Sequence, residues 1–118
     1  MINKKILHAA VIMILGLMCF TGTAQASVDV AVAKIERIGP DPRFADSASS
    51  GFMVQLTDTA ANPAWTGIRQ FYLSAALGNT GVATLLTAFS LGELVWVRIG
   101  GTAESGSLIS IIFVNAPQ

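Results

Sequence analysis

Apolar and polar residues alternate in several stretches of this chain, and a period of two predicts β-strands with one buried face. The first stretch, 28–33, carries valine at every second position and slips phase near Lys34, where we expect a bulge or a strong twist. The Gly-Pro-Asp-Pro segment at 39–42 is expected to end this strand, because proline cannot donate to a strand ladder. The serine-containing segment that follows, up to Gly51, has no periodicity and predicts an exposed loop.

Two more strands are predicted before the middle of the chain. In 52–57 every second residue is large and apolar, so these side chains should face the core. An Asn-Pro pair at 62–63 marks the loop that follows. A third strand is expected at 68–73, with Phe71 pointing to one side of it and Tyr72 to the other.

Between Gly78 and Gly92 the period changes to that of a helix. Four large apolar residues recur at i, i+3, i+4 and i+7, which places them on one helical face. They are Val82, Leu85, Leu86 and Phe89. Asn79 or Thr80 is expected to cap the start of the helix, and Gly92 is expected to end it in the left-handed conformation.

The last two strands are expected at 94–99 and 108–114, joined by a glycine-containing hairpin loop. The first alternates, with three β-branched residues on one face. Both faces of the second are largely apolar, which predicts a strand that is central in its sheet or covered on its second side. The order β-β-β-α-β-β in about 90 residues predicts a mainly β fold with one helix (α+β), a small five-stranded barrel of the OB type.

The N-terminal residues 1–26 have the pattern of a secretory signal peptide that is cleaved. Two lysines precede a stretch free of charged residues at 6–20, and Ala-Gln-Ala at 24–26 has small residues at both positions that signal peptidase reads. A membrane-spanning helix would need roughly 20 apolar residues, which is longer than this stretch. We therefore expect no stable membrane anchor after cleavage, and a single OB-like domain, 27–118, that is periplasmic or secreted.

Composition then restricts the chemistry. The single histidine and the single cysteine, His8 and Cys19, both lie in the predicted signal. The chain from Ser27 therefore has no imidazole base, thiol nucleophile, disulfide or His/Cys metal site. Its five basic and seven acidic residues offer no basic surface for nucleic acid. We predict a protein that is not an enzyme and has no catalytic residues, cofactor or metal; an enzyme that uses carboxylates alone is the remaining catalytic alternative.

The stretch 84–99, TLLTAFSLGELVWVRI, combines a helix that ends at Gly92 with a valine-rich strand. Together with the order of elements, it resembles the binding (B) subunits of AB5 toxins, the B subunit of subtilase cytotoxin in particular, over residues 71–114. The resemblance implies an OB fold, glycan binding and assembly into rings of identical subunits. It carries no binding residues to this chain, because the sugar-contacting positions of those subunits have no residue-by-residue match. Their structural disulfide has no counterpart after Ser27.

Aromatic residues around the loop before the third strand form the candidate ligand site. Trp65, Arg69 and Tyr72 are the predicted ligand-binding residues, because a sugar ring can stack on an aromatic face there. The alternative is that these aromatic side chains pack in the core.

The predicted outer face of the helix has no charge, whereas a solvent-exposed helix usually carries lysine and glutamate. Its residues are Ala83, Thr84, Thr87, Ala88 and Ser90. This face predicts an interface between copies of the chain, formed by Ala83, Thr84, Thr87, Trp96 and Arg98. The alternative is an ordinary threonine- and serine-rich surface of an exported protein.

These observations predict an exported binding module that is a homo-oligomer and recognises a glycan or a cell surface. The alternative function is that of a periplasmic inhibitor or accessory protein that docks on another exported protein.

Overall fold

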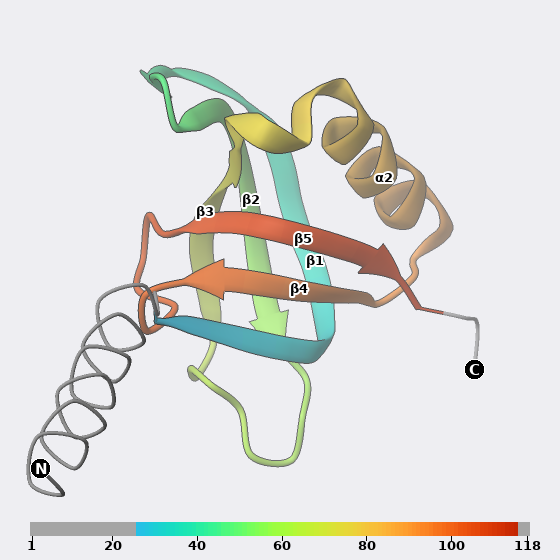
Figure 1. Ribbon diagram of the computed structural model, residues 1–118. Coiled ribbons are helices and arrows are strands. Elements are labelled where there is room, and N and C mark those ends of the chain that lie inside the picture. The colour runs from blue at the N-terminus through green and yellow to red at the C-terminus, as the bar shows by residue number, and fades with distance from the viewer. Residues whose placement is uncertain (1–25, 116–118) are drawn as a thin grey trace, which may run out of the picture.

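The computed structural model describes residues 26–115, so the predicted export signal lies, except for Ala26, outside the described residues. Within them the structure is mainly β with one α-helix, as predicted (Figure 1). The elements are β1 (Ser27–Ala45), β2 (Ser49–Asp58), β3 (Ile68–Ser74), the 3-10 turn η1 (Ala75–Leu77), α2 (Gly78–Leu91), β4 (Val95–Gly100) and β5 (Leu108–Val114).

The five strands close into a ring in the order β1-β2-β3-β5-β4. All neighbours are antiparallel except β3 and β5, which are parallel. β1 pairs with β4 through its first half and with β2 from Ala33 onwards, and register shifts follow Val30 and Ile35. Such irregularities bend a strand. They lie on either side of Lys34, which confirms the predicted irregularity there.

β1 continues past the point where the sequence predicted its end. It runs through Pro40 and Pro42, and Pro40 is aligned with Phe52 of β2. This half of β1 pairs with β2 alone, and proline is tolerated in a strand that has a free edge. The predicted exposed loop is correspondingly short, because 46–48 form the turn and Ser49 is already buried in β2.

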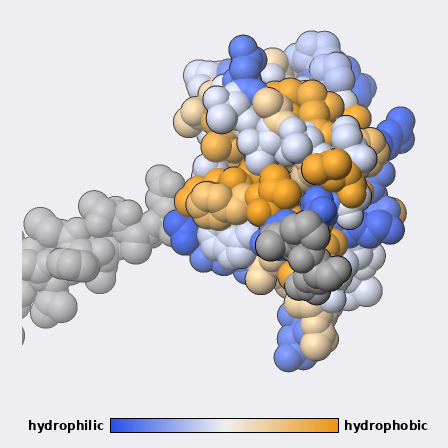
Figure 2. All heavy atoms as spheres, turned by 90° about the vertical axis from the view of Figure 1, so that its right-hand side faces the viewer, coloured by the Kyte–Doolittle hydropathy of each residue, from blue (hydrophilic) through white to orange (hydrophobic). Residues whose placement is uncertain are grey.

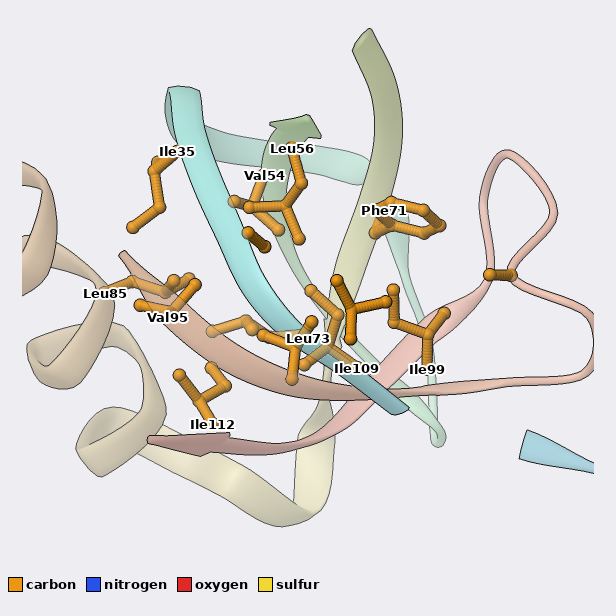
Figure 3. Close-up of a cluster of buried hydrophobic side chains, with 14 of the residues drawn as sticks. Ile35, Val54, Leu56, Phe71, Leu73, Leu85, Val95, Ile99, Ile109 and Ile112 are labelled. Atoms are coloured by element: carbon orange, nitrogen blue, oxygen red, sulfur yellow. The ribbon is translucent and has the colours of Figure 1, made fainter. Parts of the chain in front are cut away.

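The core fills the interior of the ring, as Figure 3 shows. The largest fully buried side chains are Val54, Leu56, Phe71, Leu73, Leu85, Val95, Val97, Ile99 and Ile109. They confirm the alternation predicted for 52–57, 68–73 and 94–99. Burial of each such side chain stabilises the fold by about 1.5–3 kcal/mol.

The predicted alternative that β5 is central in its sheet is confirmed, because it pairs with both β3 and β4, but the outer side of its end is not covered. Ile109 and Ile111 have partners in β4, but Ser110 between them has none. This bulge moves the inward position from Ile109 to Ile112. Phe113 consequently points outward and is 61% exposed.

α2 ends as predicted, at Gly92, whose φ of 69° is left-handed and whose backbone N–H donates to the last turn. Its start differs from the prediction. The cap position is Leu77, which makes no side-chain hydrogen bond, and neither Asn79 nor Thr80 caps the helix. The reason is that η1 leads directly into α2.

α2 is also rotated relative to the predicted orientation. Gly81, Leu85 and Ala88 are its buried residues, so the prediction that Ala88 faces outward is wrong. Leu86 and Phe89, predicted to face inward, are 47% and 45% exposed. Two small residues thus flank Leu85 on the buried side, while large apolar side chains lie at the surface.

Candidate functional site

The outer face of β1, β2 and β3 carries a row of long polar side chains. Arg37 of β1 is aligned with Gln55 of β2, and Gln55 with Gln70 of β3. Gln55 Nε2 donates to Gln70 Oε1 at 3.4 Å, and Gln70 Nε2 donates to the Tyr72 hydroxyl oxygen at 2.7 Å. We call Arg37, Gln55, Gln70 and Tyr72 the polar row.

Phe44, near the tip of the β1–β2 hairpin, covers one end of the polar row. Its ring lies 4.9 Å from that of Tyr72, centroid to centroid, and the Arg43 guanidinium lies 5.6 Å from the Phe44 centroid. Tyr72 faces away from Phe71, as predicted, yet it is only 4% exposed because Phe44 covers it. Phe44 itself is 49% exposed, so part of its side chain is accessible to solvent beside the polar row.

Two hollows include residues of the polar row: one of about 400 Å³ is lined by Arg37, Gln55 and Gln70, and one of about 360 Å³ is lined by Tyr72 together with Phe44. Each lies near the lower end of the range of roughly 300–1,000 Å³ that is typical of ligand sites. The lining of the first includes Arg37, Asp41, Arg43, Met53, Gln55 and Gln70. The lining of the second includes Phe44, Asp46, Ser49, Tyr72, Gly106 and Leu108.

Two arginines at the polar row differ in whether they form an ion pair. Arg43 donates to both carboxylate oxygens of Asp41, at 2.9 and 3.1 Å. This hydrogen bonding, more than charge attraction, lowers the pKa of Asp41 below its ordinary value. Arg37, in contrast, has no ion-pair partner within residues 26–115. Its guanidinium is thus available to bind the oxygen atoms of a ligand.

The turn that carries Phe44 is fixed by Asp46. Asp46 Oδ1 accepts hydrogen bonds from the backbone N–H groups of Ser49 at 2.7 Å and Ala48 at 2.8 Å. These two bonds, the one from Ser49 first, lower the pKa of the Asp46 carboxyl. The ionised carboxylate therefore helps to hold Phe44 over Tyr72.

Trp65, one of the predicted ligand-binding residues, is 4% exposed. Its indole N–H donates to the Leu56 carbonyl oxygen at 3.2 Å, and its ring packs edge-on against Phe71 at 5.0 Å. Trp65 thus belongs to the core, and its ring has no free face for a sugar in this arrangement.

Arg69 lies beside Trp65 rather than in the polar row. Its Nη1 donates to the Ala103 carbonyl oxygen at 2.7 Å, and its guanidinium lies 5.8 Å from the Trp65 ring centroid. Of the three predicted ligand-binding residues, Tyr72 is thus the one that contributes to the polar row. Arg37, Phe44, Gln55 and Gln70 were not among the ligand-binding residues predicted from the sequence.

The predicted interface residues of α2 lie at the surface. The Thr84 and Thr87 hydroxyls donate to the carbonyl oxygens of Thr80 and Ala83, each at 2.8 Å. Because these hydroxyls already donate hydrogen bonds within the helix, removing them from water costs less free energy than it would for free hydroxyls.

The predicted interface residues of β4 lie on its outer face. The Trp96 ring is 5.5 Å from that of Phe113, centroid to centroid. Arg98 lies 5.7 Å from the Trp96 centroid and donates to both carboxylate oxygens of Asp29, at 2.7 and 3.0 Å. Arg98 is therefore held within the chain, whereas Trp96 extends the apolar area around Phe113.

Within residues 26–115, His, Cys, Asp and Glu form no group of three or more that could hold a metal ion. In the same part of the chain, no helix has the length and apolar character needed to cross a membrane. Comparison with protein-family models, curated proteins and solved structures finds no match. The function is therefore inferred from the site itself.

Proposed function

We propose that this protein is an exported, non-enzymatic module that binds a glycan on the polar row beside Phe44. The observation that carries this proposal is that the polar row of Arg37, Gln55 and Gln70 continues through Tyr72 to the half-exposed ring of Phe44. Amide and guanidinium groups offer donors and acceptors that suit sugar hydroxyls, and the aromatic ring offers an apolar face to a sugar ring. The N-terminal pattern of residues 1–26 supports export.

The strand order supports an OB-type barrel. In that fold the face of strands 2 and 3, with the loops between strands 1 and 2 and strands 4 and 5, binds oligosaccharides or oligonucleotides. The polar row and its hollows draw on the corresponding elements: β2 and β3, the hairpin that carries Phe44, and Gly106 between β4 and β5. An oligosaccharide suits this site better than an oligonucleotide, because acidic residues outnumber basic ones after Ser27.

A glycan array probed with the protein purified after export, followed by titration of the best ligand, tests the proposal. We expect Arg37→Met to weaken binding about tenfold or more, since a charge-assisted hydrogen bond contributes about 1.5–3 kcal/mol. The matched control is Lys34→Met, because Lys34 is also an exposed cation of β1 but lies outside both hollows. The glycan affinity of the Lys34→Met variant should equal that of the unaltered protein.

Two results would overturn the glycan proposal. The first is that no glycan binds at all. The second is that a glycan binds with an affinity that neither Arg37→Met nor Phe44→Ala alters. Tight binding of another exported protein without any glycan would instead favour the docking function.

A further inference from the structure

Large apolar side chains are exposed together on α2 and at the end of β5. Leu86, Phe89 and Leu91 of α2 and Phe113 and Val114 of β5 are between 39% and 67% exposed. We call these five residues the apolar surface. Figure 2 shows the side of the molecule that carries α2 and the end of β5, where apolar residues gather with small polar residues between them.

The two elements that carry the apolar surface are neighbours in the fold. α2 packs against β5. The segment that follows α2 is tied to the end of β5, because the Asn115 backbone N–H donates to the Leu94 carbonyl oxygen at 2.9 Å. The ring of Trp96 continues the surface on β4, beside Phe113. Adjoining exposed apolar residues of this kind mark an interaction site more often than scattered ones do.

The two elements that carry the apolar surface contain no charged residues. Neither α2 nor β5 contains an aspartate, glutamate, lysine or arginine. An uncharged surface meets its own copy without like-charge repulsion, and it has no charge with which to select an oppositely charged partner. An interfacial helix that binds an anionic membrane is typically rich in lysine and arginine, which α2 lacks.

We propose that the apolar surface binds the same surface of a second copy of this chain, in a two-fold symmetric dimer. A ring of identical subunits would need two different surfaces that fit each other, whereas a two-fold dimer needs one surface that fits itself. Within residues 26–115 the remaining exposed large apolar side chains are Phe44, which belongs to the glycan site, and Ile68. The described chain thus offers one apolar surface, and this favours the two-fold dimer over the ring that the toxin resemblance implies.

Such a dimer would leave both polar rows open, because they lie on β1, β2 and β3 and the contact lies on α2 and β5. Two glycan sites in one particle raise the apparent affinity for a surface that displays many glycans. Dimerisation does not itself depend on the glycan proposal.

Sedimentation velocity and native mass spectrometry of the protein purified after export test the dimer. We expect a mass of two chains. The double variant Leu86→Lys/Phe113→Lys should shift the protein to one chain, because two lysines per copy would face each other across the two-fold axis. Both positions are exposed, so the fold should persist, and circular dichroism melting checks this. The matched control is Ile68→Lys, at a position that is 60% exposed but lies on β3, and it should remain dimeric.

A single chain at high protein concentration would overturn the proposal. So would a closed ring of more than two chains, or a dimer that survives both lysines. Titration with a monovalent glycan separates this result from the function proposed above, since the double lysine variant should bind each glycan as tightly as the unaltered protein does.

Discussion

The polar row and the apolar surface lie on the same ring of strands, but they arise in different ways. The polar row follows the regular alternation of β2 and β3, in which every second residue faces outward. The apolar surface has two other origins: the bulge at Ser110 turns Phe113 outward, and α2 buries Leu85 and Ala88 and so leaves Leu86 and Phe89 exposed. Regular alternation thus places polar groups outside, whereas the bulge of β5 and the orientation of α2 expose large apolar groups that a monomer gains nothing by exposing.

The two regions also differ in the interactions that their side chains make within the chain. In the polar row, Gln55, Gln70 and Tyr72 already bond to one another, whereas Arg37 has no ion-pair partner among residues 26–115. In the apolar surface, the large side chains of Leu86 and Phe89 are about half exposed in the structure of residues 26–115. A ligand at the first region would add hydrogen bonds, while a partner at the second would remove apolar area from water.

Replacing Trp65 should have the largest effect, and it separates the core from the polar row. We expect Trp65→Ala to lower the free energy of unfolding by about 3–5 kcal/mol, because a buried indole and its hydrogen bond are lost. Glycan affinity, measured well below the melting temperature, should stay within about twofold, a difference of less than 1 kcal/mol. Urea unfolding and glycan titration measure the two quantities.

The same variant tests the role that the sequence predicted for Trp65. If the unfolding free energy hardly changed while glycan affinity fell sharply, Trp65 would be the stacking platform after all. Trp65→Phe is the informative companion, because it keeps an aromatic ring and removes the indole N–H. It should lose less stability than Trp65→Ala.

Alanine substitutions of two neighbouring leucines in α2 test how the buried side of the helix and the apolar surface differ in their contribution to stability. Leu85→Ala should lower the free energy of unfolding by about 2–5 kcal/mol, since Leu85 is fully buried. Leu86→Ala should lower it by less than about 1 kcal/mol in the monomer, because Leu86 is half exposed. Urea unfolding at low protein concentration is the measurement. Equal losses would contradict the burial of Leu85 and the exposure of Leu86.

Much of the fold could be predicted because the spacing of apolar residues along a segment indicates which side chains are buried. The stretches 52–57, 68–73 and 94–99 alternate without interruption, and each proved to be a strand with the expected face inside. The course of β1 through Pro40 could not be predicted in this way. Proline is compatible with a strand only when its pairing leaves an edge free, and that depends on strands far away in the sequence.

The site was less predictable than the fold for a related reason. Gln55 and Gln70 could be placed on an outer face from alternation alone, but Arg37 follows an irregular part of β1 that obscures its direction. Phe44 covers Tyr72 only because the hairpin folds back over β3, a contact between residues distant in sequence. Trp65 looked accessible because it lies in a loop, and nothing local shows that the loop turns its indole into the core.

A smaller effect is expected at the turn that supports the polar row. Gly51 has a φ of 75°, and a Cβ atom there would lie 2.9 Å from the Cβ atom of Ala45. We expect Gly51→Ala to cost at least about 1–2 kcal/mol of stability through the left-handed backbone alone. It should also weaken glycan binding, because the hairpin that holds Phe44 must shift. Gly39→Ala is the control for stability, since a Cβ atom at Gly39 meets nothing within 4 Å.

The smallest effect concerns the charge of Asp46. The backbone N–H groups of Ser49 and Ala48 lower its pKa below the ordinary value of 3.8. At a pH above that ordinary pKa, the ionised form therefore contributes its full stabilisation of the turn. This stabilisation is lost as the pH falls through the lowered pKa. Amide hydrogen exchange at Ala48 and Ser49, corrected for the intrinsic pH dependence of exchange, should show reduced protection at acidic pH. In Asp46→Asn the amide oxygen can still accept both bonds but does not ionise, so this change should disappear. Persistence of the change in Asp46→Asn would mean that another carboxyl group, such as Asp41 in its pair with Arg43, controls the position of Phe44 over the polar row.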